Sequence, residues 1–273
     1  MKLIIFTTCK PFVGDDYWRQ EQAIKSWTLL ENIEKKIIII GNDKGTKRLC
    51  EKYNLIHEPN VRNLNGVPYL YEMFLIANKY AEDDDVMLWT NSDMIYYQDM
   101  IDNIYAFKKQ KPDETNYLLV GQRIDWINSK FLKNLSKSLF FDKINLNNKQ
   151  TAKVDMLNSL YNECAMHAAC GIDYVIHSKT TFLNKLDPNL VIAGTRHDMI
   201  LVGIGIEHNY FTCDITKTCQ VIHQNHDYYY EDSNLLRLRK INNNSCNGTQ
   251  KSITDCKYKS QYNADNSIEF IKK

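Results

Sequence analysis

The first hundred residues alternate between continuous apolar runs and segments with apolar residues at helical spacing. Continuous runs of this kind are typical of strands buried on both faces of a parallel sheet. They predict strands over residues 2–8, 36–43, 55–57 and 86–89. The helically spaced segments predict helices over residues 17–33, 45–53 and 71–81. This βαβαβαβ order is typical of a parallel sheet whose strands are joined by right-handed crossovers.

Beyond residue 93 the pattern becomes less regular. It predicts helices over 97–108 and 199–208 and strands over 117–123, 171–177 and 219–223. A polar stretch over residues 129–168, rich in Asn and Lys, is expected to be helical with loops. From residue 231 onward the chain is polar and weakly patterned.

The length of 273 residues suits one large α/β domain that buries a substantial core. No internal repeat and no Pro- or Gly-rich linker marks a boundary within it. We therefore expect a single domain over residues 1–230, with residues 231–273 as a polar C-terminal tail that packs on the same domain.

Charge and composition narrow the classes of partner and compartment. The net charge of +1 gives no overall field that would favour nucleic acid, and no apolar run has the length of a membrane span. The apolar start of the chain is too short for a signal peptide. The eight cysteines offer three close pairs but no zinc-knuckle spacing; the pairs are Cys164/Cys170, Cys213/Cys219 and Cys246/Cys256. Without an export signal we expect free thiols in a cytoplasmic protein.

A short polar motif ends the apolar strand at residues 86–89. Ligands of open α/β sheets bind just beyond the carboxyl ends of the strands, which is where Asp93 lies. A carboxylate beside the small polar side chains of Asn91 and Ser92 suits a hard divalent cation. The alternative is an ordinary turn, because Asn, Ser and Asp are common turn residues.

Two further groups could carry chemistry. Asp198 precedes a predicted helix, whose dipole favours the charged form of a nearby carboxylate, although helix capping is the alternative explanation. His223 and His226 lie at a strand end, where imidazoles can bind a metal, although hydrogen-bonded structural histidines are the alternative. A zinc protease is disfavoured, because Gln224 and Asn225 stand where its helical motif needs a Glu.

Three motifs of common enzyme classes are absent from the sequence. It has no Walker-type loop, no GxGxxG after the first strand and no GxSxG elbow. These absences disfavour kinase, dehydrogenase and hydrolase functions.

Several short motifs occur in one order over about residues 1–230 and carry a family resemblance. They are Gly66-Val67-Pro68, Thr90-Asn91-Ser92-Asp93, Gly121-Gln122-Arg123, Gly171-Ile172-Asp173-Tyr174, Ala193-Gly194-Thr195-Arg196-His197-Asp198, Asp214-Ile215-Thr216 and His223-Gln224-Asn225-His226-Asp227-Tyr228. In this ordered set the chain resembles GT-A type nucleotide-diphospho-sugar glycosyltransferases, in particular a group in which Asn-Ser-Asp replaces the usual Asp-x-Asp. The resemblance implies a Rossmann-like α/β fold with a mixed, mainly parallel central sheet flanked by helices.

The same resemblance implies a metal site and a catalytic base. Asp93 would bind Mn²⁺ or Mg²⁺, which neutralises the leaving diphosphate, and His226 or else His223 would complete the metal shell. Asn91 departs from the usual first Asp and leaves one fewer anionic ligand. Asp198 would be the general base that takes the proton from an acceptor hydroxyl, as in inverting enzymes.

The remaining assignments follow from place in the family's fold. Asp43 and the end of the first strand (Thr7, Thr8 and Cys9) would line the nucleoside. Arg62 would reach the diphosphate, and Asp173 would hold hydroxyls of the donor or acceptor. The donor-binding residues are then Thr7, Thr8, Cys9, Asp43, Arg62, Asn91, Ser92 and Asp173.

The sequence thus predicts a metal-dependent hexosyl- or deoxyhexosyltransferase that moves a sugar from a nucleotide-sugar, with a UDP-sugar favoured, to a glycan or other hydroxyl acceptor. The polar stretch 129–168 would face that acceptor. Two alternatives are a non-catalytic carbohydrate- or nucleotide-binding protein and a sugar-nucleotidyltransferase. The second is disfavoured because the first strand lacks a Gly-rich, basic loop for a triphosphate.

Overall fold

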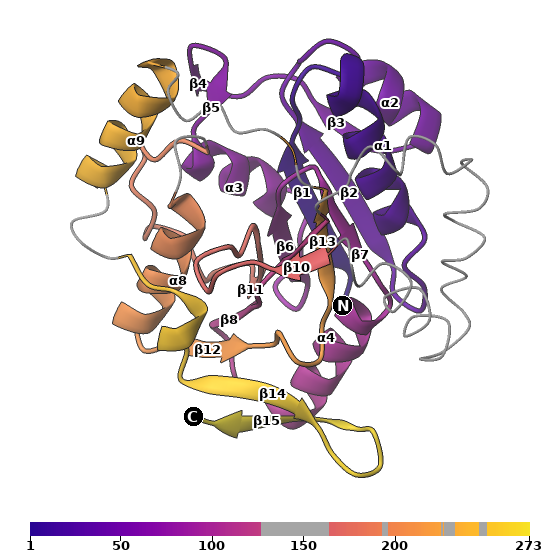
Figure 1. The fold of residues 1–273 in the computed structure, drawn as a ribbon, viewed down its shortest axis with the longest axis vertical. Helices are drawn as coiled ribbons and strands as arrows, with labels where there is room; N and C mark the ends of the chain where they lie inside the picture. Colours follow the sequence, from indigo (N-terminus) through magenta and orange to yellow (C-terminus); the bar gives the residue numbers. More distant parts are fainter. Residues whose placement is uncertain (127–163, 193–195, 225, 227–232, 246–249) are drawn as a thin grey trace.

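The computed structural model describes residues 1–126, 164–192, 196–224, 226, 233–245 and 250–273. Its main sheet has nine strands in the order β15-β14-β12-β8-β11-β6-β1-β2-β3 (Figure 1). In chain order these are β1 (Leu3–Thr8), β2 (Lys35–Ile40), β3 (Ile56–Glu58), β6 (Val86–Thr90), β8 (Tyr117–Val120), β11 (Tyr174–Ser178), β12 (Phe211–Asp214), β14 (Tyr258–Tyr262) and β15 (Ile268–Lys272). Five neighbouring pairs are parallel and three antiparallel, which confirms the predicted mixed, mainly parallel sheet.

The first half of the sheet follows the predicted alternation of strands and helices. β1 pairs in parallel with both β2 and β6, and β2 pairs in parallel with β3. The connecting helices are α1 (Gly14–Thr28), α2 (Thr46–Tyr53) and α3 (Leu70–Asn78). α1 ends at Thr28 rather than at residue 33. Leu29 and Leu30 donate to carbonyls only three residues back, and Asn32 adopts a left-handed φ of 62° that a right-handed helix cannot include.

Successive side chains of β1 pack on opposite faces of the sheet, as strand geometry requires. Leu3 and Ile5 belong to the core under α1, α2 and α4 (Asp99–Gln110). Ile4 and Phe6 belong to the core under α3 and α8 (His197–Glu207). Because helices cover both faces, the central strand is apolar at every position from Leu3 to Phe6.

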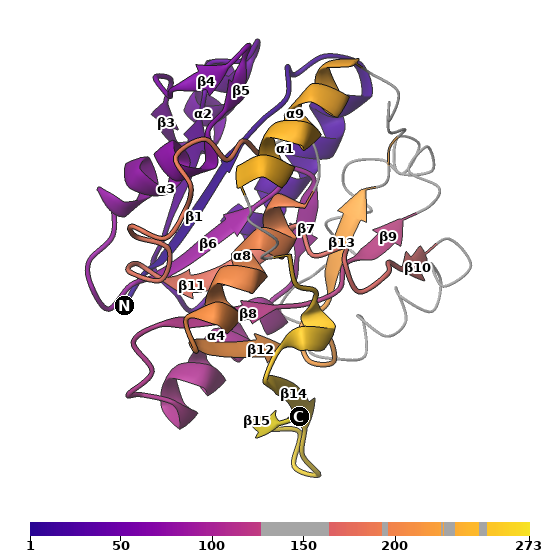
Figure 2. The same ribbon diagram turned by 90° about the vertical axis from the view of Figure 1, so that its left-hand side faces the viewer.

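A second, four-stranded sheet lies beside the main one, in the order β10-β9-β13-β7 (Figure 2). Its strands are β7 (Met94–Tyr96), β9 (Ile124–Trp126), β10 (Cys164–Met166) and β13 (Val221–Gln224). β13 runs antiparallel to β7 and places His223 opposite Met94. This pairing brings the turn after β6 next to the end of β13.

The C-terminal part contains regular structure that the sequence analysis did not assign. It holds α9 (Ser233–Ser245), a short 3-10 helix (Ile253–Asp255) and the antiparallel hairpin β14–β15. β14 pairs in parallel with β12 and extends the main sheet, as Figure 1 shows at its lower end. A further small hairpin, β4 (Asn63–Leu64) with β5 (Val67–Pro68), lies just before α3. The division of the chain at residue 230 stays a prediction.

Two features bear on the compartment. Within the ranges that the structure describes, no helix is long and apolar enough to cross a membrane. Cys170, Cys213 and Cys256, one from each candidate pair, are free thiols. The cytoplasmic location stays a prediction, and the predicted insertion over residues 129–168 lies almost wholly outside the described residues.

His177 in β11 makes the stability of the fold dependent on pH. The ring is fully buried against Phe74 and Phe182, and burial lowers its pKa to about 3. The pKa of His177 is lower in the folded state than in the unfolded chain. The contribution of the neutral ring to the free energy of unfolding is therefore fully present above about pH 6.5. It is lost on acidification, by up to about 1.4 kcal/mol per pH unit. We expect His177→Phe to flatten this dependence in denaturant unfolding measured between about pH 4 and 7. An unchanged slope would contradict a buried neutral ring.

Candidate functional site

Asp93 ends the turn between β6 and β7 and carries an unsatisfied oxygen. Its side chain is 15% exposed, yet its Oδ1 is buried and has no hydrogen-bond partner among the described residues. A buried carboxylate oxygen without a partner costs free energy, so such an atom needs an explanation. A cation bound at this position would satisfy it.

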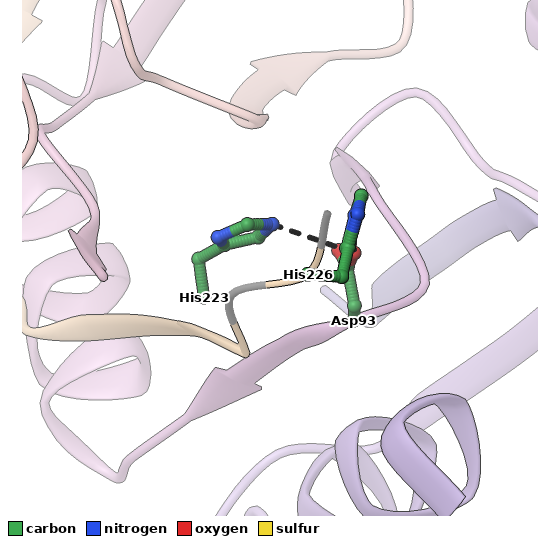
Figure 3. Close-up of side chains that lie close together, drawn as sticks. All are labelled: Asp93, His223 and His226. Carbon is green, nitrogen blue, oxygen red and sulfur yellow. Dashed lines mark ion pairs between the residues drawn. The ribbon is translucent and has the colours of Figure 1, made fainter. Parts of the chain in front are cut away.

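Two histidines face the same carboxylate (Figure 3). Nε2 of His223 lies 3.5 Å from Asp93 Oδ2, and Nε2 of His226 lies 3.3 Å from the same atom. One ligand atom from each of the three residues falls within 4.8 Å of the others. One carboxylate and two imidazoles are a common ligand set for a divalent transition metal with positions left open for other ligands. The donor set therefore fits Mn²⁺ and similar ions.

The charges of this cluster are strongly coupled. Burial raises the pKa of Asp93, but His223 and His226 outweigh burial and hold that pKa well below its ordinary value. Burial lowers the pKa of His223, whereas Asp93 and Asp125 raise it, and the net result lies above the ordinary value. The carboxylates and the His223 ring therefore stabilise each other's charged forms, a role that a bound cation would take over.

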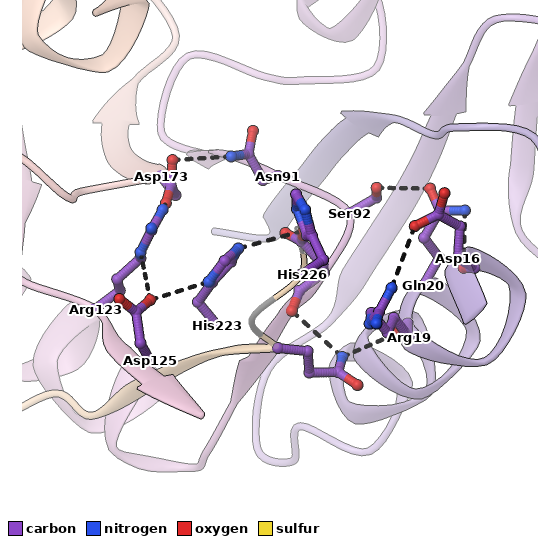
Figure 4. A network of polar contacts seen from close by, with 12 residues as sticks. Asp16, Arg19, Gln20, Asn91, Ser92, Arg123, Asp125, Asp173, His223 and His226 are labelled. Carbon is purple, nitrogen blue, oxygen red and sulfur yellow. Dashed lines mark hydrogen bonds and ion pairs between the residues drawn. The ribbon is translucent and has the colours of Figure 1, made fainter. Parts of the chain in front are cut away.

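A polar network continues from His223 to Asp173 (Figure 4). Nδ1 of His223 lies 3.0 Å from Asp125 Oδ1, and Arg123 Nε donates to the same oxygen over 2.9 Å. The Arg123 guanidinium also pairs with the Asp173 carboxylate. Burial raises the pKa of Asp125, but hydrogen bonds from His223 and His167 outweigh burial and leave that pKa well below its ordinary value.

The Asn91 side chain holds Asp173 rather than facing the cluster of Asp93, His223 and His226. Its Nδ2 donates to Asp173 Oδ1 over 2.9 Å, and its backbone N–H donates to the Asp173 carbonyl over 3.0 Å. Asp173 has a left-handed φ of 56°, which an L-residue adopts only at a cost. The amide at position 91 can donate to this carboxylate, whereas an aspartate there could not. This contact gives a physical reason for Asn rather than Asp at position 91.

We therefore expect Asn91→Asp to destabilise the protein. The change removes the hydrogen bond from the Asn91 amide to the Asp173 carboxylate and places two carboxylates against each other. Such a change lowers the free energy of unfolding by about 1–3 kcal/mol. Chemical denaturation at neutral pH measures the loss. The control is the double change Asn91→Asp with Asp173→Asn, which reverses donor and acceptor and should recover part of it. Equal stability of the single variant and the wild type would show that the contact is unimportant.

Asp198 lies in the first turn of α8 and is 6% exposed. Its Oδ1 accepts the Met199 N–H over 2.9 Å, and its Oδ2 lies 3.5 Å from the Asp173 backbone N–H. The N-cap residue of α8 is Arg196, and the first contact of Asp198 is with the N–H of the next residue inside the helix. The second contact links Asp198 to the network around Arg123. The described contacts thus join Asp198 to the metal cluster through Asp173.

The ends of β1 and β2 meet at the same edge of the sheet as Asp93. A Cβ on Gly41, whose φ is +109°, would lie 3.2 Å from Thr8 Oγ1 and 3.8 Å from Asp43 Oδ2, so both side chains border this turn. Burial raises the pKa of Asp43. Burial also raises the pKa of the Cys9 thiol, and the nearby Cys50 and Asp43 add to this shift. Thr7 is fully buried, and its hydroxyl donates to the Thr8 carbonyl.

Two other predicted donor residues differ in their surroundings. The Ser92 hydroxyl donates to Gln20 Oε1 over 2.8 Å, at the edge that carries Asp93. Arg62 donates from Nε to Glu72 over 3.2 Å, and its guanidinium lies 4.0 Å from the centre of the Tyr69 ring. The Arg62 guanidinium also donates to the Pro188 carbonyl, and none of these three contacts joins Arg62 to the Asp93 cluster.

Sequence reasoning assigned no role to Arg123, Asp125 or His167. Arg123 was part of one motif of the family resemblance, but nothing in the sequence indicates its two carboxylate partners. The contact between Asp125 and His223 depends on the parallel pairing of β9 with β13, which sets these residues opposite each other. Only knowledge of that register could have identified Asp125.

No protein-family model matches the chain, and no curated protein matches it. Among solved structures, S. aureus TarS 1–349 in complex with UDP-GlcNAc aligns at 11% identity over 90% of this chain and 68% of that one, with a TM-score of 0.50. In another structure of TarS 1–349 the alignment covers 46% of this chain and 36% of that one, with a TM-score of 0.36.

A second enzyme gives a more extensive match. Glucosyl-3-phosphoglycerate synthase from Mycobacterium tuberculosis, in complex with Mn²⁺, UDP and phosphoglyceric acid, aligns at 12% identity over 100% of this chain and 86% of that one, with a TM-score of 0.50. At this identity the likeness shows the fold alone. The chain has a GT-A-like α/β fold, which it shares with TarS and this synthase.

Proposed function

We propose that the protein is a metal-dependent glycosyltransferase, which moves a sugar from a nucleotide-sugar to an acceptor hydroxyl. The observation that carries this proposal is the cluster of Asp93, His223 and His226 at the carboxyl end of β6, with one buried Asp93 oxygen that has no partner in the described part of the chain. In open α/β sheets this edge is the ligand-binding edge. The GT-A-like fold adds support, because the TarS and synthase structures were determined with UDP-GlcNAc and with UDP.

The three ligands would hold a divalent cation and leave positions open for diphosphate oxygens. The ion, when bound, supplies Lewis-acid help to the departing diphosphate. Two imidazoles in the set favour Mn²⁺ over Mg²⁺, because Mg²⁺ prefers oxygen ligands. The imidazoles also compensate for the anionic ligand that Asn91 does not provide.

The other residues would bind the donor and move a proton. Thr8, Cys9 and Asp43 border the edge where the nucleoside would lie, and a UDP-sugar is the favoured donor. Asp173 would hold sugar hydroxyls, since its carboxylate is fixed by Asn91 and Arg123. Asp198 would accept the proton of the attacking hydroxyl, which implies inversion at the anomeric carbon.

Calorimetric titration of the wild-type protein with UDP, GDP and CDP, each with and without Mn²⁺, tests the proposal. We expect one nucleotide to bind, with an affinity that depends on Mn²⁺ and less on Mg²⁺. Turnover of the matching nucleotide-sugars then distinguishes a transferase from a binding protein that keeps the fold. Failure to bind any nucleotide would refute the proposed function, and binding that ignores the ion would point to a metal-independent protein.

A further inference from the structure

The carboxylate of Asp125 lies beside the His223 ring (Figure 4). The two ring nitrogens contact different carboxylates: Nδ1 is 3.0 Å from Asp125 Oδ1, and Nε2 is 3.5 Å from Asp93 Oδ2. His223 is 1% exposed, so its ring has little freedom to choose other partners. The parallel register of β9 and β13 sets Asp125 directly opposite His223.

Asp125 is itself held in place from two sides. Its Oδ1 also accepts a hydrogen bond from Arg123 Nε over 2.9 Å, while its Oδ2 lies 2.6 Å from His167 Nδ1. Arg123 is 6% exposed and is fixed in turn by Asp173. The carboxylate therefore cannot rotate without losing contacts on both oxygens, and Oδ1 stays directed at His223.

We propose that Asp125 is a positioning residue for the metal site, an inference that rests on the proposed function. By accepting a hydrogen bond from Nδ1–H of His223, Asp125 fixes the tautomer in which Nε2 carries no proton. Nε2 is then the nitrogen that faces Asp93 and is able to bind a cation. The hydrogen bond made by one ring nitrogen commonly decides which nitrogen binds the metal, and it raises the basicity of the ligand.

Asp125→Ala is expected to weaken Mn²⁺ binding without removing a ligand. Loss of such an outer partner typically lowers metal affinity about 10–100-fold. Titration of Mn²⁺, followed by electron paramagnetic resonance of the free ion, measures this change without any need for turnover. A second readout is ¹⁵N NMR of labelled histidine in the ion-free protein, at a pH where the His223 ring is neutral. The wild type should show Nδ1 protonated, and Asp125→Ala should shift the proton towards Nε2.

Asp125→Asn provides a graded variant that preserves shape. Arg123 only donates hydrogen bonds, so it keeps the amide oxygen at the Oδ1 position, where it still accepts from His223. We expect this variant to keep the wild-type tautomer and to lose less than about tenfold in Mn²⁺ affinity, since only the charge is removed. It also keeps the proposal testable if Asp125→Ala folds poorly.

Asp85→Ala serves as a matched control. Asp85 is a buried aspartate just before β6, where it accepts backbone N–H groups from Lys2 over 2.6 Å and Glu82 over 2.9 Å. Its loss should lower stability but leave Mn²⁺ affinity and the His223 tautomer unchanged. Wild-type Mn²⁺ affinity or an unchanged tautomer in Asp125→Ala would overturn the positioning role. If the wild type binds no Mn²⁺ while Asp125→Ala still switches the tautomer, the metal-dependent function fails and the orientation of His223 by Asp125 stands.

Discussion

Asp93→Ala is expected to abolish Mn²⁺-dependent nucleotide binding, with a loss of at least about 100-fold in the affinity for Mn²⁺ and UDP together. Asp93 is the only carboxylate of the three-residue cluster, so its removal leaves two neutral imidazoles to hold a divalent cation. It also removes the buried Oδ1 that lacks a partner among the described residues. Calorimetry with UDP at fixed Mn²⁺ measures the change.

The control for Asp93→Ala is again Asp85→Ala, at the other end of the same strand. Both changes remove an aspartate next to β6, but only Asp93 lies beside His223 and His226. Asp85→Ala should bind UDP and Mn²⁺ as the wild type does. If the Asp93→Ala variant still binds UDP in a Mn²⁺-dependent way and with wild-type affinity, the metal site lies elsewhere in the chain.

Asp198→Asn is expected to lower kcat by about 10²–10⁴, the usual contribution of a general base. UDP and Mn²⁺ binding should stay unchanged, because the described contacts of Asp198 are with Met199 and Asp173 and not with the metal ligands. The amide keeps an oxygen that can accept the Met199 N–H. It cannot take a proton from an acceptor hydroxyl at neutral pH.

This substitution also separates catalysis from helix capping. Asn is as good as Asp near a helix N-terminus, so capping alone predicts that Asp198→Asn leaves both stability and turnover intact. A catalytic base predicts intact stability and lost turnover. NMR of the product gives an independent check, since a base at this position implies inversion of the donor's anomeric configuration. A product that keeps the donor's configuration would contradict the role.

The sequence predicted the central strands because each lies in the most regular environment of the fold. β1, β2 and β6 are covered by helices on both faces, and such burial produces unbroken apolar runs. The edge hairpin has no such signal. β14 has three consecutive polar residues between two tyrosines, and its fully buried Ser260 lies 2.5 Å from the Thr218 hydroxyl, so a polar residue occupies a core position. Burial of a paired hydroxyl cannot be read from a hydropathy pattern.

The same limit applies to the site. Asp93 and the two histidines could be predicted from their places at strand ends and from the family resemblance. Asp125 could not, because its contact with His223 spans 98 residues and depends on a strand pairing in the small sheet. Arg123 likewise acquires its two partners only in the folded chain. Contacts between distant strands therefore carry the part of the site that sequence patterns do not encode.

The pairing of β7 with β13 would also couple the proposed metal binding to folding. It joins segments that an unfolded chain would hold far apart, and closing so long a loop is entropically unfavourable and slow. The unfolded chain therefore cannot offer Asp93, His223 and His226 to one ion at the same time. An ion that binds only the folded state stabilises it by mass action, by about 2.7 kcal/mol at one hundred times its dissociation constant. Bound Mn²⁺ would thus act as a non-covalent cross-link between two distant parts of the chain.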